Sequence, residues 1–115
     1  ENITVISIVD RYLEHSRIFY FQNAGTPELY CSSADWMSRN LDRRIELMFP
    51  VLDKTAFEQI KNYLNTYFED NTNAQILLPT GNWESITKSK KDESVRAQEV
   101  LYKKYFLHQK QMYQD

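Results

Sequence analysis

The sequence predicts one α/β domain with a mixed sheet in its first half and two helices in its second half. Up to about residue 52 the apolar residues form short β-branched or alternating runs, which are typical of strands. After residue 52 they recur at helical spacing. Hydrophobic residues make up 42% of the 115 residues, and this is enough for a core, so we do not expect disorder.

Four segments of the first half predict strands. Residues 3–9 form a nearly continuous β-branched run, which predicts a strand buried on both faces. "RIFYFQ" (17–22) and "ELYCSS" (28–33) flank "NAGTP", whose Gly and Pro favour a hairpin turn. "RRIELMFPVL" (43–52) alternates and places a proline where a strand end tolerates it. This alternation predicts that the core-facing side carries Ile45, Leu47, Phe49 and Val51.

The second half predicts two helices separated by a loop. Thr55 and Glu58 have capping-box spacing, and the apolar stripe after them predicts about four turns of helix that end near residues 69–73. "AQILLPTGNWESITKSKKDE" (74–93) predicts a surface loop, because it contains Pro, Gly and many lysines. Ser94 is a candidate cap for a final helix to about residue 112. Its expected packing residues are Val95, Leu101, Tyr102, Tyr105 and Phe106.

Composition excludes several classes of function. The formal net charge is −2, which argues against bulk electrostatic binding of polyanions such as nucleic acid, so a phosphate site must be local. The single cysteine excludes an internal disulfide and a multi-cysteine zinc site. No apolar run reaches the length of a membrane span. The chain opens on "ENITVISIVD", without Met, so we expect a fragment of a longer protein.

Polar pairs at two-residue spacing stand at the ends of the predicted strands. His15 and Arg17 leave the same face of a strand and suit one anion, because imidazole titrates near neutral pH and guanidinium offers a fixed fork of donors. The same spacing recurs in two further pairs, Ser33 with Asp35 and Arg44 with Glu46. Three strands would thus each present a polar pair.

Structural alternatives exist for each of these residues. A lone histidine is more often a surface residue, and the arginines at 43 and 44 with Glu46 also suit a solvated, ion-paired face. "SADW" (33–36) also suits a helix N-cap. Cys31 is interpreted as a small packing residue because no base is paired with it, Trp83 as a packing residue, and His108 as a surface residue.

Three segments carry a resemblance to a known family. "SIVDRYLEHSRIFYF" (7–21), "YCSSADWMSRNLDRRIELMFPVLD" (30–53) and "VRAQ" (95–98) closely resemble the C-terminal domain of bacterial polyphosphate kinases. That family is similar in fold to phospholipase D, so the resemblance implies a partial phospholipase-D-like domain. His15 and Arg17 stand in the place of its HxK motif, with Arg replacing Lys, and Ser33 stands near its following polar position.

The resemblance implies reversible transfer of the terminal phosphate of ATP to inorganic polyphosphate through a phosphohistidine in a preceding domain. His15 matches the family's second essential histidine, which contacts the phosphates of the nucleotide and protonates an oxygen or the leaving group. Arg17 and Arg44 would bind phosphate, and Glu46 would orient a neighbour or hold Mg²⁺ through water. Supporting positions are Ser33, Asp35 and Arg39.

Further implications concern cofactor, partners and location. Mg²⁺ is expected as a cofactor bound with ATP. The protein ligands of the Mg²⁺ ion are expected in the preceding domain. Expected partners are ATP, ADP, polyphosphate and the upstream domains, in a homo-oligomer without nucleic acid. The expected location is the cytoplasm, and a peripheral position at the inner membrane is a second expectation.

Two other function classes stay open at the level of sequence. The segment would serve only as a docking or oligomerisation module of the same enzyme if loss of His15 were tolerated. It would be a phospholipase-D-like phosphodiesterase if it cleaved artificial diesters without ATP, although Arg17 in place of Lys argues against this.

Overall fold

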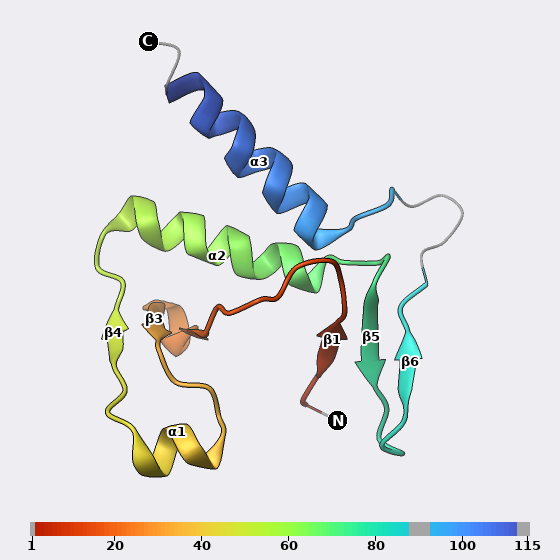
Figure 1. Ribbon diagram of the computed structural model, residues 1–115, viewed down its shortest axis with the longest axis horizontal. Coiled ribbons are helices and arrows are strands. Elements are labelled where there is room, and N and C mark those ends of the chain that lie inside the picture. Colours follow the sequence, from red (N-terminus) through yellow and green to blue (C-terminus); the bar gives the residue numbers. More distant parts are fainter. Residues whose placement is uncertain (1, 88–92, 113–115) are drawn as a thin grey trace. The chain divides into compact units, whose positions relative to one another are not determined.

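The computed structural model describes residues 2–87 and 93–112, with side chains described up to Phe106 in the last helix (Figure 1). The chain forms two compact units. Unit 1 consists of residues 1–13 and 65–115, and unit 2 consists of residues 14–64. The boundary at residue 64 falls within one continuous helix.

Unit 2 contains a three-stranded antiparallel sheet with the strand order β2-β3-β4. The strands are β2 (Ile18–Phe21), β3 (Glu28–Ser32) and β4 (Met48–Pro50). A short 3₁₀ turn, η1 (Asn23–Gly25), joins β2 and β3, and Gly25 takes a φ of 102°, which glycine adopts without strain. The hairpin predicted for residues 17–33 is therefore confirmed.

Two helices follow in the chain. α1 (Ser38–Arg43) precedes β4, and α2 (Lys54–Phe68) follows it. The 15 residues of α2 confirm the predicted length of about four turns. Its N-cap is Asp53, whose Oδ1 accepts a hydrogen bond of 2.8 Å from the Ala56 N–H, so the predicted capping box at Thr55 was two residues late.

The prediction of a long alternating strand over residues 43–52 was wrong in its extent and in its burial. β4 covers only three of these residues. Three of the four side chains expected in the core are open to solvent, with Ile45 99%, Leu47 68% and Phe49 55% exposed, whereas Val51 is partly buried. In unit 2 the buried apolar side chains are Leu29 and Ala34. Alternation specifies which residues share a face, but another layer must cover that face before it becomes a core.

Unit 1 contains a second antiparallel sheet with the order β1-β5-β6. Its strands are β1 (Ile6–Ile8), β5 (Ala74–Leu77) and β6 (Trp83–Ser85), and Figure 1 shows them side by side. The prediction of a surface loop over residues 74–93 was therefore wrong for its first part, which forms a hairpin turning at Gly81. Residues 88–92 lie outside the described residues. These strands are short, and β5 pairs with a segment almost 70 residues earlier, which no local pattern reveals.

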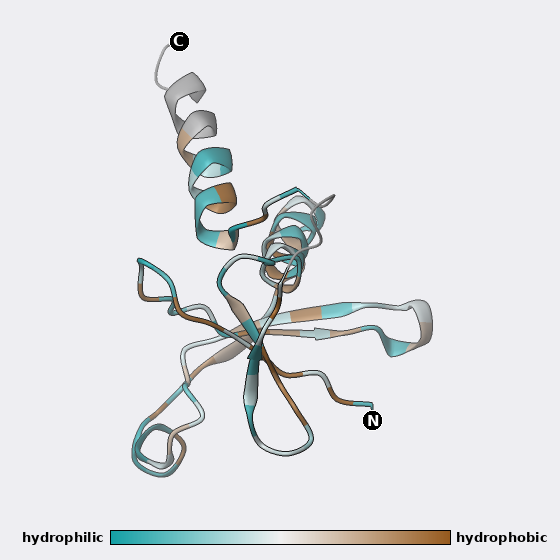
Figure 2. Ribbon diagram, turned by 90° about the vertical axis from the view of Figure 1, so that its right-hand side faces the viewer, coloured by the Kyte–Doolittle hydropathy of each residue, from teal (hydrophilic) through white to brown (hydrophobic). Residues whose placement is uncertain are grey.

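The ends of unit 1 also differ from expectation. Only residues 6–8 of the first apolar run form a strand, and Ile3 and Val9 are 85% and 82% exposed. α3 (Ala97–Met112) begins three residues after Ser94. Its residues Ala97 and Leu101 are buried, whereas Tyr102, Tyr105 and Phe106 stay partly exposed, and hydrophobic and hydrophilic residues are interspersed along the described part of α3 (Figure 2).

The α/β class is confirmed, although the strands of the described residues pair only in antiparallel fashion and form two small sheets in place of one mixed sheet. The described helices include none that is both long and apolar enough to cross a membrane.

Candidate functional site

A histidine, an arginine and an aspartate are connected at one end of the unit 2 sheet. Arg17 directly precedes β2, and its backbone oxygen accepts a hydrogen bond from Ser32 N–H at the end of β3. This pairing brings the residues after β3 next to Arg17. The Arg17 Nε donates to Asp35 Oδ1 at 2.6 Å, and Nη2 lies 2.5 Å from the same oxygen. The guanidinium is thus fixed by a carboxylate 18 residues away in the chain.

Arg17 also binds His15. Its Nη1 donates to the His15 carbonyl oxygen at 3.0 Å, and its Nη2 lies 2.9 Å from His15 Nε2. The Arg17 side chain is only 15% exposed, although His15 itself is exposed. The hydrogen bond and the charge of Arg17 hold the pKa of Asp35 below its ordinary value, so Asp35 is ionised at neutral pH.

Tyr63 of α2 holds the chain on both sides of His15. The Tyr63 hydroxyl donates to Glu14 Oε2 at 3.0 Å and lies 2.8 Å from Ser16 Oγ. These are the residues immediately before and after the histidine. The backbone at His15 is therefore anchored to α2, while its ring is anchored to Arg17.

Ser33 and Glu46 form a second polar group in the same unit. Ser33 Oγ donates to Glu46 Oε2 and accepts a hydrogen bond of 3.0 Å from Leu47 N–H. The Ser33 N–H in turn donates to the Leu47 carbonyl at 3.0 Å, which extends the pairing of β3 and β4 beyond Ser32. Glu46 is thereby oriented by a strand end.

Arg39 and Arg44 join neither group by a hydrogen bond or ion pair within residues 2–87 and 93–112. Arg39 lies on α1, and its charge contributes weakly to the low pKa of Asp35. Arg44 follows α1 in extended conformation and is exposed. The expectation that Arg44 and Glu46 project from one regular strand was wrong, because residues 44–46 are not part of β4.

Other candidate residues behave as packing or surface groups. Cys31 is partly buried, and burial raises the pKa of its thiol, which disfavours the thiolate needed in a nucleophile. The proposed N-cap in "SADW" was wrong, since α1 has Met37 at its N-cap without a side-chain bond. Trp36 is 80% exposed and stacks on Phe19, and Trp83 begins β6 at 46% exposure. The His108 side chain lies outside the described residues.

Among the described residues, no group of three His, Cys, Asp or Glu side chains is arranged to hold a metal ion. Glu46 accepts the Ser33 hydroxyl, and its expected role as a water-mediated Mg²⁺ ligand stays a prediction. One buried polar atom in this unit, Asn40 Oδ1, has no hydrogen-bond partner in the described part of the chain.

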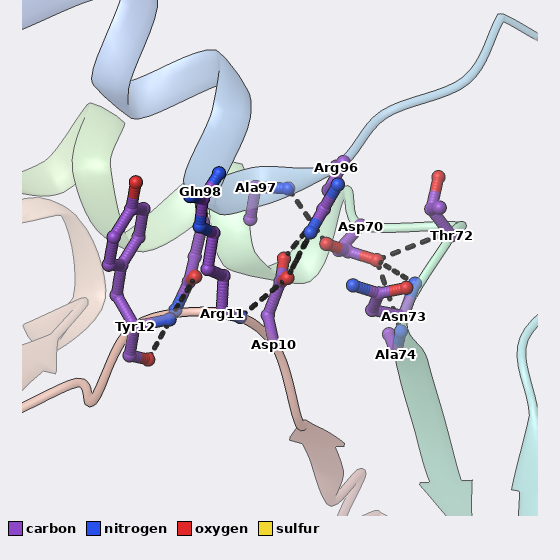
Figure 3. A network of polar contacts seen from close by, with 10 residues as sticks. All are labelled: Asp10, Arg11, Tyr12, Asp70, Thr72, Asn73, Ala74, Arg96, Ala97 and Gln98. Atoms are coloured by element: carbon purple, nitrogen blue, oxygen red, sulfur yellow. Dashed lines mark hydrogen bonds and ion pairs between the residues drawn. The ribbon is translucent and has the colours of Figure 1, made fainter.

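Unit 1 contains a polar network that sequence reasoning missed (Figure 3). Arg96 Nη2 lies 2.6 Å from Asp10 Oδ1, and Arg96 Nε donates to both Asp10 oxygens at 3.2 and 3.0 Å. The Asp10 side chain is only 1% exposed. Mainly through the Arg96 hydrogen bonds and against the opposing effect of burial, its pKa is lowered from 3.8 to about 2.

Gln98 and Tyr12 join the same two segments. Tyr12 N–H donates to Gln98 Oε1 at 2.8 Å, and Gln98 Nε2 donates to the Tyr12 carbonyl at 2.7 Å. The Gln98 side chain therefore binds both the N–H and the carbonyl of Tyr12, as a neighbouring strand would. The segments "SIVD" and "VRAQ", which both carried the family resemblance, are in contact through Asp10 and Arg96, which are 86 residues apart in the sequence.

Asp70 completes the network from the turn after α2. Its Oδ1 accepts the backbone N–H groups of Thr72, Asn73 and Ala74 at 2.8 to 3.0 Å, and its Oδ2 accepts Ala97 N–H at 2.7 Å. Burial raises the pKa of this carboxyl, but the four N–H groups outweigh that effect and lower it. The sequence offered two signals for this network, an Asp after a helix and an Arg-Ala-Gln motif. Neither signal shows which residues the Asp or the motif would bind.

Comparison with known proteins assigns the chain to a family. Residues 1–98 match the family model described as polyphosphate kinase C-terminal domain 2. Polyphosphate kinase of Rhodopirellula baltica is 49% identical over 102 residues, which cover 89% of this chain and 12% of that protein. Polyphosphate kinase of Pseudomonas aeruginosa is 46% identical over 103 residues, which cover 90% of this chain and 15% of that protein.

A solved structure agrees with this match. The crystal structure of polyphosphate kinase from Porphyromonas gingivalis superimposes with a TM-score of 0.83 at 40% identity, covering 96% of this chain and 17% of that one. The chain therefore spans between 12% and 17% of the length of these three relatives. On the family model, the sequence identity and the shared fold, this chain belongs to the polyphosphate kinase family and corresponds to part of its C-terminal domain.

Proposed function

We propose that this chain supplies one part of the nucleotide and phosphate site of a polyphosphate kinase, which transfers the terminal phosphate of ATP reversibly to inorganic polyphosphate. The observation that carries the proposal is the group His15, Arg17 and Asp35, which are joined by hydrogen bonds at an exposed sheet end. Family membership supports it, because the relatives with near 50% identity are polyphosphate kinases.

The proposed reaction breaks the bond between the γ-phosphorus of ATP and the oxygen that bridges to the β-phosphate. The phosphoryl group passes to a histidine of a preceding domain and then to a terminal oxygen of polyphosphate, and the bridging oxygen leaves with ADP. Because phosphoryl transfer is catalysed mainly by positioning and charge stabilisation, N–H donors and cations near the transferring group are the groups this chain would contribute.

The residues divide these tasks. His15 presents an imidazole N–H to phosphate oxygens of the nucleotide, and the exposed Arg44 neutralises charge on the transferring group. Glu46 is held by Ser33 and orients groups at this end of the sheet. Asp35 fixes Arg17, and Arg39 supports the charge balance around Asp35.

Mg²⁺ belongs to this proposal as part of the Mg–ATP substrate. It would neutralise phosphate charge, and its protein ligands are proposed to come from the preceding domain. Assembly into a homo-oligomer, contact with upstream domains, a cytoplasmic location and peripheral attachment to the inner membrane stay predictions.

The test uses the full-length protein of which this chain is a part. We expect His15→Ala to lower ATP-dependent polyphosphate synthesis by about 100-fold or more, as removal of one group that stabilises the transition state does. Label from γ-³²P-ATP retained on the protein should fall in parallel. His108→Ala is the matched control, because it removes the chain's other histidine, for which the sequence predicts a surface position.

Other outcomes point to the alternative functions. Wild-type synthesis and labelling in His15→Ala would reject the catalytic role and favour a docking or oligomerisation module. Hydrolysis of artificial phosphodiesters without ATP, lost in His15→Ala, would favour a phospholipase-D-like phosphodiesterase.

A further inference from the structure

The hydrogen bond between Arg17 and His15 determines which nitrogen of the imidazole carries a proton. A guanidinium has N–H donors and no acceptor. Because Arg17 Nη2 lies 2.9 Å from His15 Nε2, the histidine nitrogen must be the acceptor. A ring that accepts at Nε2 carries its single proton on Nδ1. In this geometry His15 is a neutral imidazole whose N–H is on the side away from Arg17.

Arg17 is held in the orientation that maintains this arrangement. Its Nε and Nη2 contact Asp35, its Nη1 is bound to the His15 carbonyl, and its side chain is 15% exposed. An imidazolium would carry a proton on Nε2 as well, directed at an N–H of Arg17, so the contact would have to break. The positive charge of the pair therefore stays on Arg17.

A neutral donor suits the leaving group of the proposed reaction. The departing oxygen belongs to the terminal phosphate of ADP, and the second pKa of a phosphate monoester is about 6. Near neutral pH such an oxygen leaves as an anion without taking a proton. What it needs is a fixed donor that stabilises the developing charge, and this requires no ionisable ring.

We infer that His15 acts as a neutral hydrogen-bond donor through Nδ1–H toward a phosphate oxygen, and that Arg17 and Asp35 are positioning residues that hold it in this tautomer. The inference rests on the proposed function and deepens it, because it replaces the proton-donating role that the family resemblance implied for His15. Within the described part of the chain, no hydrogen bond occupies Nδ1.

The decisive experiment compares three substitutions of His15 in the full-length protein. In His15→Asn the amide N–H₂ takes the position of Nδ1, and in His15→Gln the amide N–H₂ takes the position of Nε2. His15→Ala has no donor at either position. We expect kcat for ATP-dependent synthesis to fall about 100- to 1000-fold in His15→Ala and His15→Gln, but to stay within about tenfold of wild type in His15→Asn.

Each result supports or overturns the inference. If His15→Asn is as slow as His15→Ala, the reaction needs an ionisable ring, and the inference fails while the proposed function stands. If His15→Ala is as fast as wild type, the catalytic role of His15 fails, and the inference fails with it.

Arg17→Lys tests the positioning role separately. It keeps the positive charge but loses the planar fork that reaches Asp35 and His15 together. We expect kcat to fall about 10- to 100-fold, with the KM for ATP changed less than about twofold. A wild-type kcat in Arg17→Lys, with a raised KM in Arg17→Ala, would show that Arg17 binds phosphate directly and overturn the positioning role.

A chemical readout independent of activity completes the test. Diethyl pyrocarbonate acylates the unprotonated nitrogen of a neutral imidazole, which is the nitrogen covered by Arg17. Modification of His15, followed by peptide mass spectrometry, should be faster in Arg17→Lys and Asp35→Asn than in wild type. The exposed Arg43→Lys is the matched control. Equal rates in all four proteins would show that Arg17 does not cover Nε2.

Discussion

The polar networks of the two units differ in how deeply they are buried and in how many of their polar atoms have hydrogen-bond partners. In unit 1 the carboxylates of Asp10 and Asp70 are almost fully buried, and their oxygens are occupied by a guanidinium or by backbone N–H groups. In unit 2 His15 and Arg44 are exposed, and within the described residues neither His15 Nδ1 nor the Arg44 guanidinium has a hydrogen-bond partner. A saturated buried network stabilises a fold, whereas an exposed and incompletely paired one is available to a ligand.

The two tryptophans make this contrast measurable, because Trp83 lies in unit 1 and Trp36 in unit 2. In the 115-residue chain, Trp36→Phe leaves Trp83 as the reporter of unit 1, and Trp83→Phe leaves Trp36 as the reporter of unit 2. Substitutions in the two networks should affect the two reporters unequally.

The largest effect on stability is expected from Asp70→Ala. It leaves four N–H groups without their acceptor, so we expect the free energy of unfolding reported by Trp83 to fall by about 3 to 5 kcal/mol. Urea titration with Trp83 fluorescence measures it. Asp70→Asn keeps one oxygen and should lose less. A loss below about 1 kcal/mol in Asp70→Ala would contradict the assignment of Asp70 as the main link between the turn and α3.

An intermediate effect is expected from acid. The folded-state pKa of Asp10 is about 2, below its ordinary 3.8, so the folded state binds this proton more weakly than the unfolded state does. The resulting stability is fully present above about pH 4 and is lost as the pH falls through about 2. Urea unfolding followed at Trp83 between these pH values should show the loss.

Asp10→Asn is the control for the acid effect, because it removes the titrating carboxyl. Its stability should depend less steeply on pH over the same range, and the remaining slope should come from other acids with lowered pKa, such as Asp70. An equal slope in both proteins would mean that Asp10 is not ion-paired with Arg96.

The smallest effect on stability is expected from Ser33→Ala. The Ser33 hydroxyl is exposed, so its loss should cost less than about 1 kcal/mol in urea unfolding followed at Trp36. Polyphosphate synthesis by the full-length protein should nevertheless fall, because Glu46 loses its donor. A loss of unfolding free energy in Ser33→Ala as large as that in Asp70→Ala would contradict the difference between the exposed network of unit 2 and the buried network of unit 1.

Local patterns in the sequence predicted much of this protein. The hairpin around Gly25 and the length of α2 followed from turn chemistry and helical spacing. The spacing of His15, Arg17 and Asp35 placed them near one another, because the hairpin pairing brings the ends of two strands together. The short quoted motifs also indicated the family that the comparisons confirmed.

Contacts between distant segments were decided only by the tertiary structure. Asp70 binds Ala97, which is 27 positions later in the chain, and Gln98 binds Tyr12, which is 86 positions earlier. Strand β1 pairs with β5, which lies nearly 70 positions later. Exposure of Ile45 was decided in the same way, because a side chain is buried only when another element covers it. Residue types and spacing thus determined the local elements and the candidate chemistry. The partners of each polar group depended on long-range packing, which leaves no periodic signal in the chain.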